Sequence, residues 1–186
     1  MYKIINQTNI VIDNVPTAQG TEEDKNQILG QAKAMRAICY FHLIQNYQQT
    51  YAIAKDKPGV ILRLSALEEQ NLPRATVQAC YDQILKDLKD AKSLLNDYNR
   101  EGKWFINKDV VTGHLARVYL VMNNWSQALA ESTELYNAYS QLMSKEQYQK
   151  YQEEHPELVK KQAEEAQKKA EEYKKNTPLV ERIGNT

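Results

Sequence analysis

Residues 109–142 read DVVTGHLARVYLVMNNWSQALAESTELYNAYSQL, and this stretch decides the fold class. Apolar residues recur at helical spacing on both sides of the Asn123–Asn124 step. The pattern therefore predicts two helices joined by a very short turn, and helices with so short a connection pack as antiparallel neighbours.

The same stretch carries small and aromatic residues in a fixed order. Ala116 and Ala128 would let the two helices cross closely, and we expect Tyr119 and Trp125 to fill the space beside the crossing. This order agrees with the tetratricopeptide repeat pattern, which is about 34 residues long. We therefore predict an all-α fold in which antiparallel helix pairs stack as a tetratricopeptide-like array.

Upstream residues supply the other helices of this array. Residues 22–47 form the strongest predicted helix, with two apolar stripes that indicate packing on two sides. Residues 75–96 form its predicted partner, and residues 48–74 form one long loop insertion between them. Within the insertion, Val60–Leu62 is either a brief strand or an extended segment, and residues 2–14 form a further helix.

Local signals mark where two of these helices start. Thr76 and Asn107 have side chains that accept hydrogen bonds from free backbone N–H groups, so both are predicted N-caps. Trp104 and Phe105 precede the second cap, and we interpret them as a hydrophobic staple.

The composition changes near the C-terminal end. Ser144 and Gln147 form a predicted capping box, and Pro156 marks the start of a last helix with a heptad seam at Val159, Ala163, Ala166, Ala170 and Tyr173. Its Lys/Glu/Ala-rich regularity is typical of an idealised segment, for which a non-native origin is one explanation. The predicted domains are a helical domain over 1–148, a capping helix over 149–176 and a C-terminal tail over 177–186.

The charge balance argues against a nucleic-acid partner. The 186 residues include 24 Lys and Arg and 24 Asp and Glu, so the formal net charge is +0. This balance predicts no nucleic-acid partner. No apolar run is long enough to span a membrane, and no basic-then-apolar signal segment opens the sequence. We expect a soluble chain without a signal peptide or lipid-anchor cysteine, and no direct membrane insertion.

Motifs for catalysis or metal binding are missing from the sequence. His42, His114 and His155 fall on separate predicted helices and form no paired ligand spacing. Neither a phosphate-binding glycine loop nor a nucleophile elbow occurs. Cys39 and Cys80 lie in apolar helical patterns, so we interpret them as core residues, with a disulfide as the alternative. We expect no enzymatic activity, no cofactor and no metal.

One segment, Tyr47-Gln48-Gln49-Thr50-Tyr51, has the composition of a ligand site. Aromatic rings pack against the CH groups of a sugar, and amides hydrogen-bond its hydroxyls. We therefore predict that Tyr47, Gln49 and Tyr51 contact a ligand. The alternative is a loop whose tyrosines attach it to the helices.

Four segments, taken in order, together resemble the SusD/RagB family of nutrient-binding outer-membrane lipoproteins. They are Tyr2–Asp13, Gln31–Tyr47, Gly59–Ala91 and Asn107–Ala128. The order and spacing agree over about residues 1–148. Proteins of this family bind glycans or peptides on the outer face of the outer membrane and cap a TonB-dependent transporter.

The resemblance implies a non-enzymatic scaffold fragment of a glycan- or peptide-binding protein. It also implies a SusC-like TonB-dependent transporter as the partner, an outward-facing position at the outer membrane, and tetratricopeptide-like helices as the rigid scaffold. The sequence is much shorter than the family's members, and the resemblance ends near Gln149. Two alternatives remain: a general helical-repeat module for protein–protein interaction, and an engineered, truncated scaffold without a ligand site.

Overall fold

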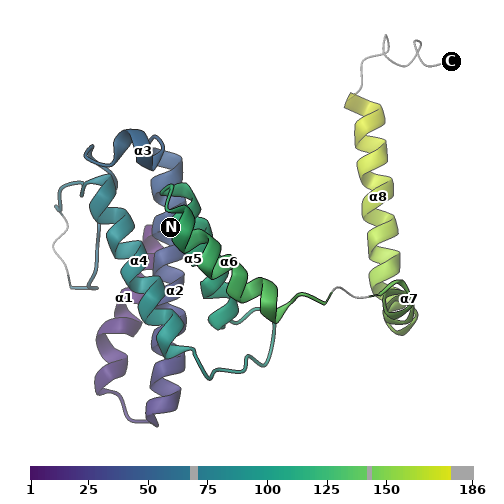
Figure 1. Cartoon of the computed structure of the whole chain (residues 1–186), viewed down its shortest axis with the longest axis horizontal. Coiled ribbons are helices and arrows are strands. Elements are labelled where there is room, and N and C mark those ends of the chain that lie inside the picture. Colours follow the sequence, from purple (N-terminus) through teal and green to yellow (C-terminus); the bar gives the residue numbers. More distant parts are fainter. Residues whose placement is uncertain (68–70, 142–143, 177–186) are drawn as a thin grey trace. The chain divides into compact units, whose positions relative to one another are not determined.

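The computed structural model describes residues 1–67, 71–141 and 144–176, and the regular elements in these ranges are helices. They are eight α-helices and one short 3-10 helix, with no strand in the described ranges. The chain divides into two units, Met1–Tyr139 and Ser140–Thr186 (Figure 1). The all-α fold class expected from the sequence is confirmed.

The first unit consists of helix pairs that pack in sequence order. α2 (Glu22–Tyr47) packs against α4 (Val77–Leu94), and α5 (Lys108–Val121) packs against α6 (Trp125–Ala138). α4 also contacts α5, and α1 (Tyr2–Asn14) contacts α2, so the pairs form one stack (Figure 1). The predicted pairing is confirmed. Two short elements complete the unit: η1 (Val15–Thr17) and α3 (Tyr51–Ala54), a helical turn inside the segment that was expected to be loop.

The helix starts follow the predicted caps. The Thr76 hydroxyl accepts a hydrogen bond from the Ala79 N–H at 3.1 Å, and the Asn107 amide oxygen accepts one from the Val110 N–H at 3.2 Å. Each bond satisfies a donor that the first helical turn leaves free. Asn123 has a φ of 59°, a left-handed conformation that asparagine tolerates, and this reverses the chain before α6.

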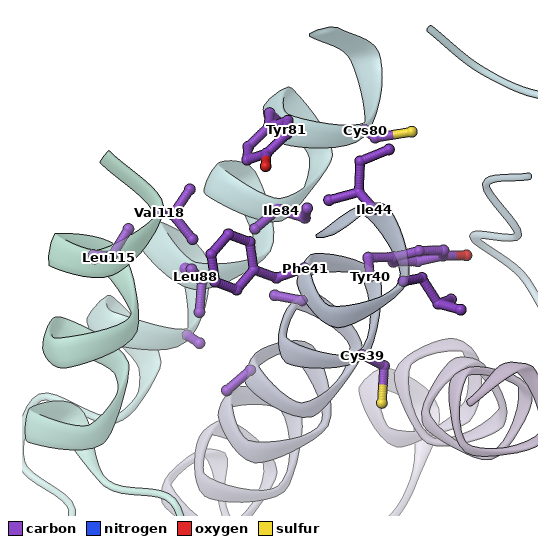
Figure 2. Close-up of a cluster of buried hydrophobic side chains, with 14 of the residues drawn as sticks. Cys39, Tyr40, Phe41, Ile44, Cys80, Tyr81, Ile84, Leu88, Leu115 and Val118 are labelled. Carbon is purple, nitrogen blue, oxygen red and sulfur yellow. The ribbon is translucent and has the colours of Figure 1, made fainter. Parts of the chain in front are cut away.

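The core of the first unit lies where α2, α4 and α5 meet. Phe41 of α2 is 1% exposed, and Figure 2 shows it among Leu88 of α4 and Leu115 and Val118 of α5. Tyr81 meets the Phe41 ring edge-on, with ring centroids 6.2 Å apart. Burial of an aromatic side chain of this size stabilises the fold by about 1.5–3 kcal/mol.

α2 is buried over a wide arc, as its two apolar stripes predicted. The arc is centred near Ala37 and includes Tyr40 and Ile44, all at most 1% exposed. Ile28 and Met35, which we assigned to a buried stripe, are 47% and 38% exposed. They share a predicted stripe with Ala32 and Cys39, which are buried, so the prediction was wrong for Ile28 and Met35.

Cys39 and Cys80 are both free thiols buried in the core. Figure 2 shows their sulfur atoms well apart. The interpretation as core residues is confirmed, and the disulfide alternative is wrong. Burial raises the pKa of both thiols, which favours the neutral, unreactive form.

The helix crossing between α5 and α6 differs from the expectation in one respect. Ala128 is 6% exposed and Tyr119 is 4% exposed, so both contribute to the crossing as predicted. Trp125, which we expected to fill the same space, is 62% exposed. Ala128 is the one buried residue of α6, and Trp125 stands at the first position of this helix, where its side chain is largely open to solvent.

The predicted hydrophobic staple before α5 is wrong for Trp104, whereas Phe105 is half-buried. Trp104 is 80% exposed and therefore cannot anchor the helix entry. Ile106, the residue next to the cap, packs partly buried against the core. It occupies the position at which a staple residue normally stands.

The second unit contains α7 (Lys145–Glu154) and α8 (Pro156–Asn176), which contact each other. Ser144 and Gln147 form both hydrogen bonds of the predicted capping box. The tail over 177–186 lies outside the described residues, and so do the side chains of the proposed seam residues other than Ala166. The domain boundary near 148 stays a prediction. None of the described helices combines the length and apolar character needed to cross a membrane.

Candidate functional site

A groove of about 760 Å³ lies at the C-terminal end of α2. The start of α1, the end of α2 and the extended segment after α3 form its walls. The lining residues are Met1, Tyr2, Leu43, Asn46, Tyr47, Gly59, Val60, Ile61 and Arg74. We take this groove as the candidate site because it combines an apolar surface with a few polar groups, as ligand pockets generally do.

The groove wall over residues 59–64 is extended but is not part of a named strand. An isolated β-bridge joins Pro58, just before the wall, to Thr76. The Gly59 N–H donates to the Ala75 carbonyl at 2.5 Å, and the Ala75 N–H donates to the Val60 carbonyl at 3.0 Å. The sequence left a brief strand and an extended segment open, and the structure has the extended segment.

Along this wall, side chains of α1 and α2 form hydrogen bonds with backbone groups that a neighbouring strand would otherwise pair. The Tyr2 hydroxyl donates to the Ile61 carbonyl at 2.9 Å. The Asn9 amide donates to the Arg63 carbonyl at 2.9 Å, and the Tyr40 hydroxyl accepts from the Arg63 N–H at 2.7 Å. The wall is therefore held by α1 and α2 together, because its backbone groups need partners away from water.

A buried arginine connects these side chains. Arg36 of α2 is 5% exposed and forms a two-pronged ion pair with Asp87 of α4, with nitrogen–oxygen distances of 2.8 and 2.7 Å. Its remaining terminal nitrogen donates to the Asn9 amide oxygen at 2.9 Å and to the Leu64 carbonyl at 3.0 Å. Sequence analysis missed this network, although Arg36 stands out as a charged residue inside an otherwise apolar arc.

Gly59 is required by the close approach of the wall to α4. A Cβ atom at this position would lie 2.9 Å from the Cys80 sulfur and 3.1 Å from the Ala75 carbonyl oxygen. A backbone oxygen cannot move aside as a flexible side chain can. Any larger residue would therefore displace the groove wall.

The exposed chemistry of the groove comes from Tyr47 and its neighbours. The Tyr47 side chain is 70% exposed, so its ring is accessible on the groove wall. Asn46 donates through its amide to the His42 carbonyl at 2.7 Å. The Arg74 Nε donates to the Gly59 carbonyl at 2.5 Å. Burial raises the pKa of the Tyr2 phenol, so this hydroxyl is a neutral donor at physiological pH.

The three predicted ligand residues do not lie together. Tyr47 lines the groove, whereas Gln49 is exposed outside the lining and its N–H donates to the Gln48 side chain at 2.8 Å. Tyr51 is partly buried, bonds the Gln78 side chain, and meets the Tyr81 ring with centroids 5.0 Å apart. Tyr51 thus attaches the loop to α4, which was the alternative interpretation of this segment.

Burial raises the pKa of the Tyr81 phenol to about 12, and the nearby Cys80 and Tyr51 add to the shift. In the described parts of the chain, no group of three or more histidine, cysteine or acidic side chains is placed to hold a metal ion.

Comparison with known proteins assigns the family. Residues 1–120 match a family of SusD-like proteins that is described as starch-binding and associating with the outer membrane. The chain belongs to this family. The resemblance recognised from the sequence is confirmed, and the family's description as a binding one agrees with the expectation that the chain is not an enzyme.

Solved and curated SusD-like proteins resemble much of the chain. A SusD-like carbohydrate-binding protein from Bacteroides vulgatus ATCC 8482 is 33% identical, with a TM-score of 0.71 over 79% of this chain and 32% of its own. A laminarin-binding SusD-like protein is 26% identical, with a TM-score of 0.62 over 73% of this chain and 28% of its own. SusD-like protein P25 of Formosa agariphila is 25% identical over 73% of this chain and 25% of its own. The SusD-like chain thus spans about a quarter to a third of these relatives.

Proposed function

We propose that this SusD-like chain is a non-enzymatic scaffold fragment of a carbohydrate-binding protein, and that the groove at the end of α2 contacts the sugar. The observation that carries the proposal is the 70% exposed Tyr47 ring on the wall of a groove of about 760 Å³. Family membership and the carbohydrate-binding and laminarin-binding relatives support the ligand class.

The groove offers the two kinds of contact that carbohydrates need. The Tyr47 ring can pack against the CH face of a pyranose ring. The Asn46 amide can donate to or accept from ring hydroxyls, and the Arg74 guanidinium can donate to them. The wall at Ile61 is already held by the Tyr2–Ile61 bond, so little ordering of the protein is needed on binding.

Calorimetric titration of the whole chain with an oligosaccharide panel tests this site. Tyr47→Ala should weaken saturable binding by about tenfold or more, in the range expected for a lost stacking contact. Tyr148→Ala is the matched control, because Tyr148 is a partly exposed tyrosine of the second unit. Equal affinity of the Tyr47→Ala variant and the parent would exclude the groove. Binding of no saccharide at all would favour a scaffold without a ligand site.

A second candidate function, protein–protein interaction, is favoured by the exposed surface of α6. Trp125, Leu129 and Tyr136 share one side of this helix and are 62%, 69% and 69% exposed. The charged residues of α6 are Glu131 and Glu134, and both pair with Lys92 on α4. The remaining surface is uncharged and rich in large rings, a composition typical of the centre of an interface.

We propose that the partner at the α6 surface is a SusC-like TonB-dependent transporter, with the SusD-like chain on the outward face of the outer membrane. The family's association with the outer membrane supports this location. Co-purification with such a transporter in detergent tests the contact. Leu129→Lys should abolish capture, whereas Lys89→Gln on α4 should not. If the Leu129→Lys variant is captured as well as the parent chain, the transporter contact does not lie on the α6 surface.

A further inference from the structure

We propose that the groove at the end of α2 selects acidic carbohydrates, and that Arg74 recognises a carboxylate or sulfate group of the sugar. This inference rests on the proposed carbohydrate-binding function, and it names the class of ligand that the same groove prefers.

The described lining of the groove carries positive charge. Among the lining residues in the described ranges, Arg74 is the one with a charged side chain. Arg74 also favours ionisation of the Tyr2 phenol, which lines the same groove. An anionic substituent in the groove would therefore meet attraction from the Arg74 guanidinium.

The Arg74 guanidinium is held in place before any ligand arrives. Its Nε donates to the Gly59 carbonyl at 2.5 Å, and Gly59 is itself bonded to Ala75 at 2.5 Å across the isolated bridge. This bond engages Nε and leaves the two terminal nitrogens as a planar pair of donors. A planar fork of this kind matches the two oxygens of a carboxylate or the edge of a sulfate.

The position of Arg74 beside an exposed ring favours a sugar acid over a free anion. Tyr47 and Arg74 line the same groove, so one ligand can place a pyranose face on the ring and its acidic group on the guanidinium. A simple anion would use only the guanidinium. An exposed arginine alone binds such ions weakly, because water and salt screen the charge.

The inference is tested by titrating the whole chain with oligosaccharides of matched length. The probes are a neutral glucan hexamer, an oligogalacturonate hexamer and a sulfated galactan hexamer. At low salt, at least one acidic probe should bind about tenfold more tightly than the neutral one, the effect expected of a charge-assisted hydrogen bond. The preference should shrink as the salt concentration rises. The two acidic probes distinguish a carboxylate from a sulfate ligand.

Matched variants assign the preference to Arg74. Arg74→Gln should lower the ratio of acidic-probe affinity to neutral-probe affinity to near one, and Arg74→Lys should keep part of this ratio because the charge remains. Lys89→Gln, which removes a positive charge from the exposed side of α4, should leave the preference unchanged. Thermal unfolding of each variant checks that the fold is intact.

The outcomes separate this inference from the function on which it rests. Equal, Tyr47-dependent binding of neutral and acidic probes would overturn the acidic preference and leave the proposed function standing. An acidic preference that persists in Arg74→Gln would overturn the role of Arg74. Binding of inorganic sulfate as tightly as the sulfated sugar would also contradict the inference. Failure of every saccharide to bind would overturn both proposals.

Discussion

Arg36 and Asp87 are 51 residues apart in the sequence, yet they form a two-pronged ion pair with side chains 6% and 0% exposed. The pair joins α2 to α4 inside the first unit. The same arginine also binds Asn9 and the Leu64 carbonyl, so it connects the helix pair to the wall of the groove. A charge buried at this depth is tolerated because every one of these contacts offsets its lost hydration.

Removing one partner of this ion pair should destabilise the protein strongly. Asp87→Ala leaves the Arg36 charge buried without its counterion, which should lower the free energy of unfolding by about 3–5 kcal/mol. Asp90→Ala is the control, because Asp90 pairs with Lys33 and Lys86 nearer the surface, where such pairs contribute about 0–1 kcal/mol. Urea unfolding followed by circular dichroism measures both. Similar losses for the two variants would contradict the special role of the buried pair.

Two glycine substitutions should have opposite effects on stability. Gly59→Ala places a Cβ 2.9 Å from the Cys80 sulfur and should destabilise the fold by about 1–3 kcal/mol through overpacking. Gly113→Ala places its Cβ 3.6 Å from a Leu135 methyl group, an ordinary contact inside α5. It should stabilise the protein by about 0.5–1 kcal/mol, because alanine favours the helix. Thermal unfolding of both variants measures these changes in stability. A Gly59→Ala variant more stable than the parent would contradict the close approach of the groove wall to α4.

The crossing of α5 and α6 should depend on the size of residue 128. Ala128 is 6% exposed, so Ala128→Leu should force the two helices apart at a cost of about 1–3 kcal/mol. Ala130→Leu is the matched control, because Ala130 is exposed on the same helix and should change stability by about 0.5 kcal/mol or less. The comparison uses chemical denaturation at one temperature. Equal effects would mean that Ala128 is not at the crossing.

The stability should also depend on pH through His114. Burial is the main cause that lowers the pKa of His114 in the fold, with Arg117 and His42 adding to it. The unfolded state then binds a proton more readily than the folded state, so this contribution is present above the unfolded pKa of about 6.5 and is lost as the pH falls below it. His114→Gln should flatten the pH dependence of the unfolding free energy between pH 7.5 and about pH 5.

The control for this pH effect is His155→Gln, which leaves His114 in place and should keep the slope of the parent chain. The readout is the urea midpoint at a series of pH values. A parent chain whose midpoint is constant over this range, or rises as the pH falls, would contradict the direction of the shift.

The helix bounds were predictable because their signals are local. The caps at Thr76 and Asn107 act on backbone groups three residues ahead, and the turn at Asn123 needs only its own left-handed conformation. Periodicity likewise predicted a helix over 22–47 with two apolar stripes, and α2 is buried over a wide arc. Trp125 was misplaced because a pattern on one helix does not say which side another helix will cover.

The groove was only partly predictable. Tyr47 could be proposed from its chemistry, and it does line the groove. Tyr51 has the same chemistry but is turned to α4, where its hydroxyl bonds Gln78. The two cannot be told apart by residue type, because the difference lies in which element packs against each ring.

By itself, the sequence determined the all-helical class, the main helix bounds and the kinship, since each depends on residues close together in the chain. Only the tertiary structure decided that Arg36 meets Asp87, that Arg74 reaches the groove beside Tyr47, and that α6 presents an uncharged surface. These relationships join segments separated by tens of residues. Their free energy comes from burial and hydrogen bonding, which are set by the packing of whole helices and not by any local pattern.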